Sequence, residues 1–161
     1  MCKDKKFPSG RLIDPAPNLF IGGAEVPSQG NPNIEKILKK IHTGINFFQT
    51  QYVFDEKILK DYMKILDDAG ILEKTFFIIG LGPFASAKSA RWMNDNLFGV
   101  DIPEHIIKRL ETSKDPKSES QKICTELINV FRDIKGVHGV HLMGHNKEET
   151  IAEIIIQSKN N

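Results

Sequence analysis

Four short apolar runs alternate with amphipathic stretches along the chain, and this alternation constrains the fold more than any other feature. The runs are predicted strands at residues 19–24, 46–54, 75–79 and 137–143. Because helical segments separate the strands, the pattern predicts a parallel sheet with right-handed crossovers. The runs are nearly continuous in apolar residues, as expected when both faces of a sheet are covered.

Capping residues and helical periodicity place the intervening elements. Asn31 and Pro32 are predicted to open the first helix, and Asp55 is predicted to cap the second. Further helices are predicted at residues 86–96, 103–111, about 123–134 and 148–157. Residues 112–120 are polar and charged, which predicts a solvated loop.

Two α/β architectures fit this order. One is a parallel (βα)4 half of a TIM-type (β/α)8 barrel, since a complete barrel usually takes about 250 residues. The other is a small open doubly wound parallel sheet. In either case the 161 residues form a single domain, in which residues 1–17 are an extended lead-in.

Composition narrows the possible partners and location. Lys plus Arg number 22 and Asp plus Glu number 21, so the net charge of +1 lacks the basic excess of a nucleic-acid-binding protein. Two cysteines are too few for a disulfide scaffold. The chain shows neither a secretion signal nor an apolar run that could span a membrane. We therefore expect a cytoplasmic protein without nucleic-acid or membrane partners.

The segment from Gly80 to Ala85 matches the G-x-G-x-x-G/A pattern of dinucleotide-binding sites. It follows the third predicted strand rather than the first, and Pro83 removes a backbone N–H that a pyrophosphate would need. A tight strand-to-helix turn is the favoured interpretation.

Three histidines, His138, His141 and His145, cluster at the fourth predicted strand. The spacing puts His138 and His141 on opposite faces of a regular strand, and no Cys, Asp or Glu stands among them. No metal site is therefore predicted. His145 lies just past the strand, where barrel proteins build their sites, so a ligand contact there is a hypothesis.

Three lysines follow the first predicted strand. Lys36 and Lys40 share one face of the predicted helix, with Lys39 beside them, and a phosphate near that helix would meet their charges. The alternative is that all three are solvated.

Two glutamines near the carboxyl end of the second predicted strand are unusual for a buried parallel sheet. Gln49 and Gln51 are two residues apart and are expected to point the same way. An amide both donates and accepts hydrogen bonds, which suits a flat heteroaromatic ring. The alternative is that both amides bond to neighbouring backbone.

Four segments together resemble one family of enzymes. They are residues 40–55 (KIHTGINFFQTQYVFD), 19–27 (LFIGGAEVP), 80–83 (GLGP) and 136–143 (GVHGVHLM). In order and spacing they resemble the C-terminal half of methylenetetrahydrofolate reductases, from about Phe7 to Ile156. The resemblance implies strands five to eight of a flavin-carrying barrel. It also implies hydride transfer from a nicotinamide or another reductant, through FAD or FMN, to methylenetetrahydrofolate, giving methyltetrahydrofolate in one-carbon metabolism.

The resemblance also implies roles for individual residues. Gln51 matches the substrate-binding glutamine that contacts the pterin. Lys40 and Lys39 match basic positions near the flavin's ribityl and phosphate groups. Ala24 matches a backbone position beside the flavin, and Gln49 is implied to line the flavin ring.

The catalytic residues of the family lie on barrel strands outside this resemblance. Its catalytic glutamate belongs to the first strand and its flavin-tuning aspartate to the fourth, so the resemblance implies that this chain holds neither. We therefore expect a partner, either an N-terminal half-barrel or a second copy of this chain. The alternative hypothesis is a non-catalytic pterin-binding or assembly module that retains the half-barrel.

Overall fold

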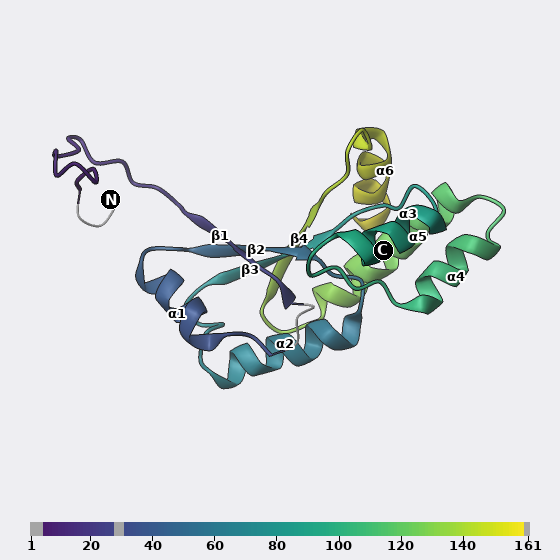
Figure 1. Ribbon diagram of the computed structural model, residues 1–161, viewed down its shortest axis with the longest axis horizontal. Helices are drawn as coiled ribbons and strands as arrows, with labels where there is room; N and C mark the ends of the chain where they lie inside the picture. The colour runs from purple at the N-terminus through teal and green to yellow at the C-terminus, as the bar shows by residue number, and fades with distance from the viewer. Residues whose placement is uncertain (1–4, 28–30, 160–161) are drawn as a thin grey trace.

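The computed structural model describes residues 5–27 and 31–159. Its one four-stranded sheet is parallel throughout, and the strands follow the order of the sequence (Figure 1). The strands are β1 (Gly22–Glu25), β2 (Phe47–Tyr52), β3 (Phe76–Leu81) and β4 (Val137–Leu142). This order confirms the (βα)4 half of a parallel barrel, because a doubly wound sheet would place its first strand in the interior.

The helices that join the strands cover one face of the sheet, as right-handed crossovers between parallel neighbours require. The joining helices are α1 (Ile34–His42), α2 (Glu56–Asp68) and α5 (Pro116–Arg132), with α3 (Ala87–Asn96) and α4 (Glu104–Thr112) between β3 and α5 along the chain, while α6 (Glu148–Lys159) follows β4 and packs against α5. Phe48, Phe77 and Ile79 point into the core beneath them.

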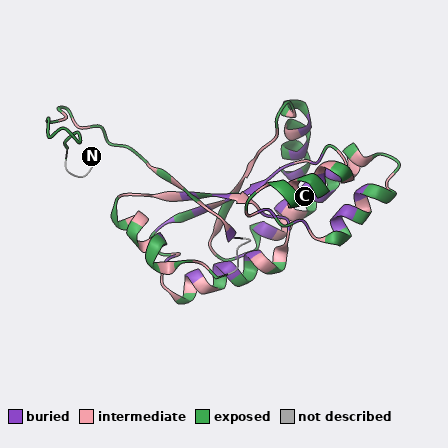
Figure 2. Cartoon of the chain, viewed as in Figure 1, coloured by how far each residue is buried: buried purple, intermediate pink, exposed green. Residues whose placement is uncertain are grey.

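The opposite face of the sheet is open within the described residues. Along β1 and β2 the residues alternate in burial, so that Gly22, Ala24 and Gln49 are exposed while Phe48 is buried (Figure 2). Phe76 of β3 is exposed on the same face. The expectation that both faces are covered is therefore wrong for this chain by itself. We call this surface the open face.

The start of α1 differs from its prediction. Asn33, rather than Asn31, caps the helix, and its side chain accepts a hydrogen bond from the Lys36 N–H at 2.9 Å. The cap of α2 is as predicted, since the Asp55 carboxylate accepts from two N–H groups of the first turn.

The predicted loop at residues 112–120 is wrong in its second half. There α5 begins at Pro116, and the Asp115 side chain accepts from the Ser118 N–H at 3.1 Å. Asp–Pro is an N-cap followed by a first-turn proline, a local signal for a helix start that outweighs the polarity of the segment. Ser120 is fully buried as a result.

Two further features of the fold are the lead-in that precedes β1 and the limited length and apolarity of the helices. Residues 5–13 fold back on themselves through a bridge between Lys6 and Leu12, and Figure 1 shows this lead-in projecting from the end of the molecule opposite α3 and α4. Within residues 5–27 and 31–159, none of the helices combines the length and the apolarity needed to cross a bilayer.

Candidate functional site

The carboxyl ends of four parallel strands meet at one edge of the sheet, which is where parallel α/β proteins place their ligands. At that edge the open face carries Ala24, Gln49 and His141 from three different strands. Gln51 lies two residues further along β2. We take this end of the open face as the candidate site.

Gln49 and Ala24 lie side by side at this edge. They are register partners between β1 and β2, and Ile78 of β3 pairs with Gln49 from the other side. Both Ala24 and Gln49 are exposed. The structure therefore brings together two of the residues that the family resemblance assigns to the flavin.

Gln51 does not repeat the orientation of Gln49 in a regular way. The pairing of β2 with β3 shifts register between Gln49 and Tyr52, and this shift breaks the period-two alternation on which the expectation rested. The Gln51 side chain donates from Nε2 to the carbonyl of Phe98 at 3.2 Å and accepts the N–H of Tyr52 at 3.0 Å. The backbone-bonded alternative thus describes Gln51 in this structure, and its pterin contact stays a prediction.

Lys40 reaches the end of β1 and is paired there. Its Nζ lies 2.6 Å from Glu25 Oε1 and 2.6 Å from the carbonyl oxygen of Ala24. The ammonium also stands 5.6 Å from the centre of the Phe48 ring. Its charge is therefore balanced within the chain, and Lys40 fixes the backbone of Ala24.

Tyr62 of α2 completes this group, since its hydroxyl donates to Glu25 Oε2 at 3.5 Å. Burial raises the pKa of Tyr62 well above its ordinary value, and the neighbouring Glu25 carboxylate raises it further. Sequence reasoning missed both Glu25 and Tyr62. The available signal was an acidic residue directly after the Gly22–Ala24 run, but nothing local indicates its partner.

Lys36 and Lys39 do not join Lys40 at the site. Both are exposed on α1. Lys39 lines a surface pocket together with Lys74, which precedes β3. Lys39 and Lys40 share the last turn of α1, but Lys40 reaches the end of β1 whereas Lys39 lies at this surface pocket beside Lys74. The structure thus separates Lys39 from Ala24 and Gln49, and its flavin contact stays a prediction.

The prediction that His138 and His141 occupy opposite faces is wrong. The register of β3 and β4 shifts between the pairs Phe77–Val137 and Ile78–Gly139, so His138 lies in a bulge where alternation fails. The His138 ring makes an edge contact with Phe76, and so it lies on the open face.

His141 also belongs to the open face. It pairs with Gly80, and its Nε2 lies 2.9 Å from the carbonyl oxygen of Thr50 on β2. Across the described part of the chain, no group of three or more His, Cys, Asp or Glu side chains is placed to hold a metal ion.

Gly80 and Gly82 of the G-x-G-x-x-A segment serve strand packing. A Cβ atom at Gly80 would stand 2.5 Å from the carbonyl oxygen of Thr50, and one at Gly82 would collide with that of Met143. Only glycine allows the neighbouring backbones to come this close. This geometry supports the tight turn rather than the dinucleotide fingerprint.

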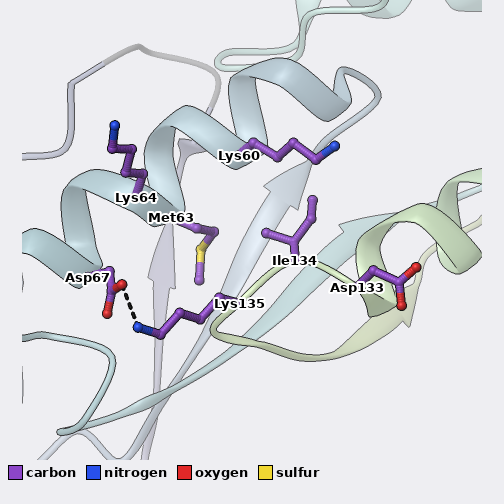
Figure 3. A pocket seen from close by; sticks show the side chains of 7 residues that line it. All are labelled: Lys60, Met63, Lys64, Asp67, Asp133, Ile134 and Lys135. Atoms are coloured by element: carbon purple, nitrogen blue, oxygen red, sulfur yellow. Dashed lines mark hydrogen bonds and ion pairs between the residues drawn. The ribbon is translucent and has the colours of Figure 1, made fainter.

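A second concave region lies at the other end of the sheet. Figure 3 shows it between α2 and the turn before β4, where Met63 and Ile134 point toward one another and Lys135 pairs with Asp67 at 2.6 Å. It adjoins the amino end of β4, whereas barrel proteins build their active sites at the carboxyl ends. We therefore assign no catalytic role to it.

Comparison with known proteins bears on this site. The family model of methylenetetrahydrofolate reductase matches residues 24–159. Among solved structures, the chain is similar to an uncharacterized protein from Clostridium thermocellum that binds two copies of 5-methyl-5,6,7,8-tetrahydrofolic acid. The TM-score is 0.57 and the identity 22%, over 91% of this chain and 54% of that one. This likeness shows the fold, and the chain spans about half the length of that protein. No curated protein matches the chain.

Proposed function

Because the chain belongs to the methylenetetrahydrofolate reductase family, we propose that it forms the folate-contacting part of a flavin-dependent reductase. The reaction is hydride transfer through the flavin to methylenetetrahydrofolate, which gives methyltetrahydrofolate. A nicotinamide or another reductant is the electron donor.

The observation that carries this proposal is the position of the amides within a family match that reaches from β1 to α6. Gln51 lies near the carboxyl end of β2, where a parallel barrel binds its substrate, and Gln49 lies two residues before it in the middle of the strand. The folate bound by the Clostridium thermocellum protein of similar fold supports the same substrate class. A pterin presents alternating donors and acceptors, and a glutamine amide matches both kinds.

The surface of β1 suits a planar cofactor. Ala24 is exposed and carries only a methyl group, so a flat ring can approach the backbone at this position, whereas the Phe47 ring already covers Gly22. In this proposal Ala24 and Gln49 contact the flavin, FAD or FMN, which supplies the hydride chemistry when bound. Lys40 acts by holding the Ala24 carbonyl in place, since its own charge is already paired with Glu25.

The proposal requires further residues for catalysis. We propose that the catalytic glutamate and the flavin-tuning aspartate come from an N-terminal half-barrel that closes over the open face. Two features support this arrangement. The open face carries exposed aromatic rings, and within the described residues β1 and β4 each have one edge without a paired strand.

The test is a calorimetric titration of 5-methyltetrahydrofolate into the 161-residue chain, alone and co-expressed with the N-terminal half-barrel of a family member. We expect folate binding in the co-expressed complex, together with flavin retention and reductase activity. Absence of folate binding in both preparations would contradict the proposal. Folate binding without any reductase activity in the complex would instead favour the non-catalytic pterin-binding module.

A further inference from the structure

The connection between α3 and α4 carries an exposed aromatic residue whose backbone contacts Gln51. Phe98 is 73% exposed, the largest exposed fraction among the large apolar residues that the structure describes as exposed. The carbonyl oxygen of the same residue accepts the hydrogen bond from Gln51 Nε2 at 3.2 Å. The ring is thus carried by a residue that touches the candidate pterin contact.

The segment that carries Phe98 is held on both sides. Before it, the N–H of Leu97 donates to the Met93 carbonyl at 2.9 Å. After it, the Asn94 side chain accepts the N–H of Ile102 at 2.7 Å and donates to its carbonyl at 3.1 Å. Val100 and Ile102 are buried in the core. Phe98 is therefore displayed at the tip of an anchored turn, and its exposure does not come from a loose chain end.

The Gln51 amide keeps capacity for a ligand while it holds this turn. Its nitrogen has two N–H donors, and the bond to the Phe98 carbonyl uses one of them. Its side chain is half-buried rather than enclosed. A polar group that suits a heteroaromatic ring therefore contacts the backbone of a residue that carries an exposed apolar ring.

We propose that Phe98 is a ligand-binding residue that packs its ring against the p-aminobenzoyl ring of a bound folate while Gln51 contacts the pterin. The inference rests on the proposed function and extends it to a specific part of the substrate. A folate joins its pterin to the aryl ring through one short linker, so neighbouring polar and aromatic side chains match its two parts. Offset or edge contacts between aromatic rings then favour the folate over a pterin that lacks the aryl group.

The experiment compares two ligands and four forms of the 161-residue chain, prepared as in the folate titration above. The ligands are 5-methyltetrahydrofolate and 6-methyltetrahydropterin, which has no aryl ring. The variants are Phe98→Ala, Phe98→Tyr and the matched control Phe7→Ala, which removes a ring from the lead-in at the far end of the molecule (Figure 1). Thermal unfolding followed by circular dichroism checks that each variant folds.

We expect Phe98→Ala to weaken binding of the folate roughly two- to tenfold, the range that one aromatic contact contributes. Binding of the pterin should not change, Phe98→Tyr should restore folate affinity, and Phe7→Ala should bind both ligands as the unmodified chain does. The ratio of the two affinities is the decisive quantity, because a merely structural role for Phe98 would alter both together.

Three outcomes overturn the inference. Unchanged folate affinity in Phe98→Ala, with normal binding by the unmodified chain, would refute the aryl contact and leave the proposed function intact. Equal losses for both ligands would show that Phe98 acts only by holding Gln51. An unmodified chain that binds neither ligand would overturn the proposed function, and this inference with it.

Discussion

At the scale of single residues, the pair between Glu25 and Lys40 decides how the end of β1 is built. The side chains are 14% and 26% exposed, so neither charge is fully solvated. Removing one partner of such a pair leaves the other charge poorly compensated, which costs more than the intact pair contributes. The Tyr62 hydroxyl and the Phe48 ring add further contacts around the pair. This group keeps Ala24 in place at the candidate site.

Tyr62 makes stability depend on pH above its ordinary pKa of 10.0. The pKa is raised in the folded chain, so above about pH 10 the unfolded chain loses a proton that the folded chain keeps. The free energy of unfolding therefore falls as the pH rises. The measurement is the free energy of unfolding by urea between about pH 8 and pH 11, and we expect it to fall more steeply with pH for the unmodified protein than for Tyr62→Phe.

The difference between the two proteins in how steeply the free energy of unfolding falls with pH isolates the contribution of Tyr62 from that of other titrating groups. Burial also raises the pKa of the Cys124 thiol, to about 12, but this group is present in both proteins and cancels in the difference. Equal slopes above pH 10 would show that Tyr62 is not held in its neutral form.

Alanine substitutions of Gln51 and Gln49 are expected to weaken the binding of different ligands, the folate and the flavin respectively. In the assembled enzyme, Gln51→Ala should weaken folate binding by roughly 1–3 kcal/mol, because a polar group of the pterin then lacks its partner. It should affect flavin affinity less. Gln49→Ala is the control and should weaken flavin binding more than folate binding. Calorimetry with each ligand measures both effects. A lower free energy of unfolding for Gln51→Ala with unchanged folate affinity would mean that Gln51 has a structural role.

At the scale of elements, α5 is tied to the turn that follows β3. Ser120 lies in the first turns of this helix, and its hydroxyl accepts the N–H of Phe84 at 2.6 Å in a fully buried position. The turn leads into α3, whose cap is formed by Ser86 and Ser89. The start of α5 therefore fixes the loop at the carboxyl end of β3, which borders the candidate site.

Replacing Ser120 by alanine tests this connection. Ser120→Ala leaves the N–H of Phe84 without its acceptor, and we expect the free energy of unfolding to fall by about 1–3 kcal/mol. Ser118→Ala is the matched control on the same helix, where the backbone bond to Asp115 is retained, and a change within about 0.5 kcal/mol is expected. Urea unfolding measures both variants. Similar losses in the two would show that the bond to Phe84 contributes nothing specific.

At the scale of the whole molecule, the open face carries a group of aromatic side chains near the amino ends of the strands. Phe20 stacks on Phe47 with the ring centres 5.3 Å apart, and Phe76 lies within 6.4 Å of Phe20. Phe20 and Phe76 are 67% and 48% exposed. A complete barrel fills its interior with layers of such side chains. Apolar surface of this kind favours association, because large exposed patches seldom persist on a monomer.

The unpaired edges of the sheet also favour association with another chain. Within the described residues β1 and β4 are the outer strands, and unpaired strand edges are open to pairing with another chain. A groove runs along β4, lined by Ile128, Arg132, Val137, His138, Gly139 and Val140. Both edges are parallel strands, so an N-terminal half-barrel or a second copy can continue the sheet.

We therefore expect the purified chain by itself to self-associate, to hold flavin poorly and to reduce no folate. Light scattering and a visible absorption spectrum measure the first two properties, and a reductase assay measures the third. The double variant Phe20→Ser, Phe76→Ser should reduce self-association, because it removes apolar area from the open face. A stable yellow monomer with reductase activity would show that no other half is needed and that the site is misplaced.

The sequence by itself determined the four strand–helix units, their parallel order and most helix limits, because hydrophobic periodicity and capping are local. The helix predicted at 86–96 is α3 at Ala87–Asn96, and the fourth strand predicted at 137–143 is β4 at Val137–Leu142. The start of α5 at Pro116 was also signalled locally, by Asp115 and the proline, but the surrounding polar residues led to a loop prediction. The first strand lies later than predicted, at Gly22–Glu25.

Only the tertiary structure decided which side chains meet at the site. Lys40 finds Glu25 fifteen residues away, and Gln51 finds the Phe98 carbonyl 47 residues away. The bulges in β2 and β4 were equally inaccessible, because alternation along one strand says nothing of a register shift that depends on its neighbour. Contacts between distant segments follow from the packing of the whole sheet and its helices, and this packing assigned Lys40 to the backbone of Ala24 and both histidines to the open face.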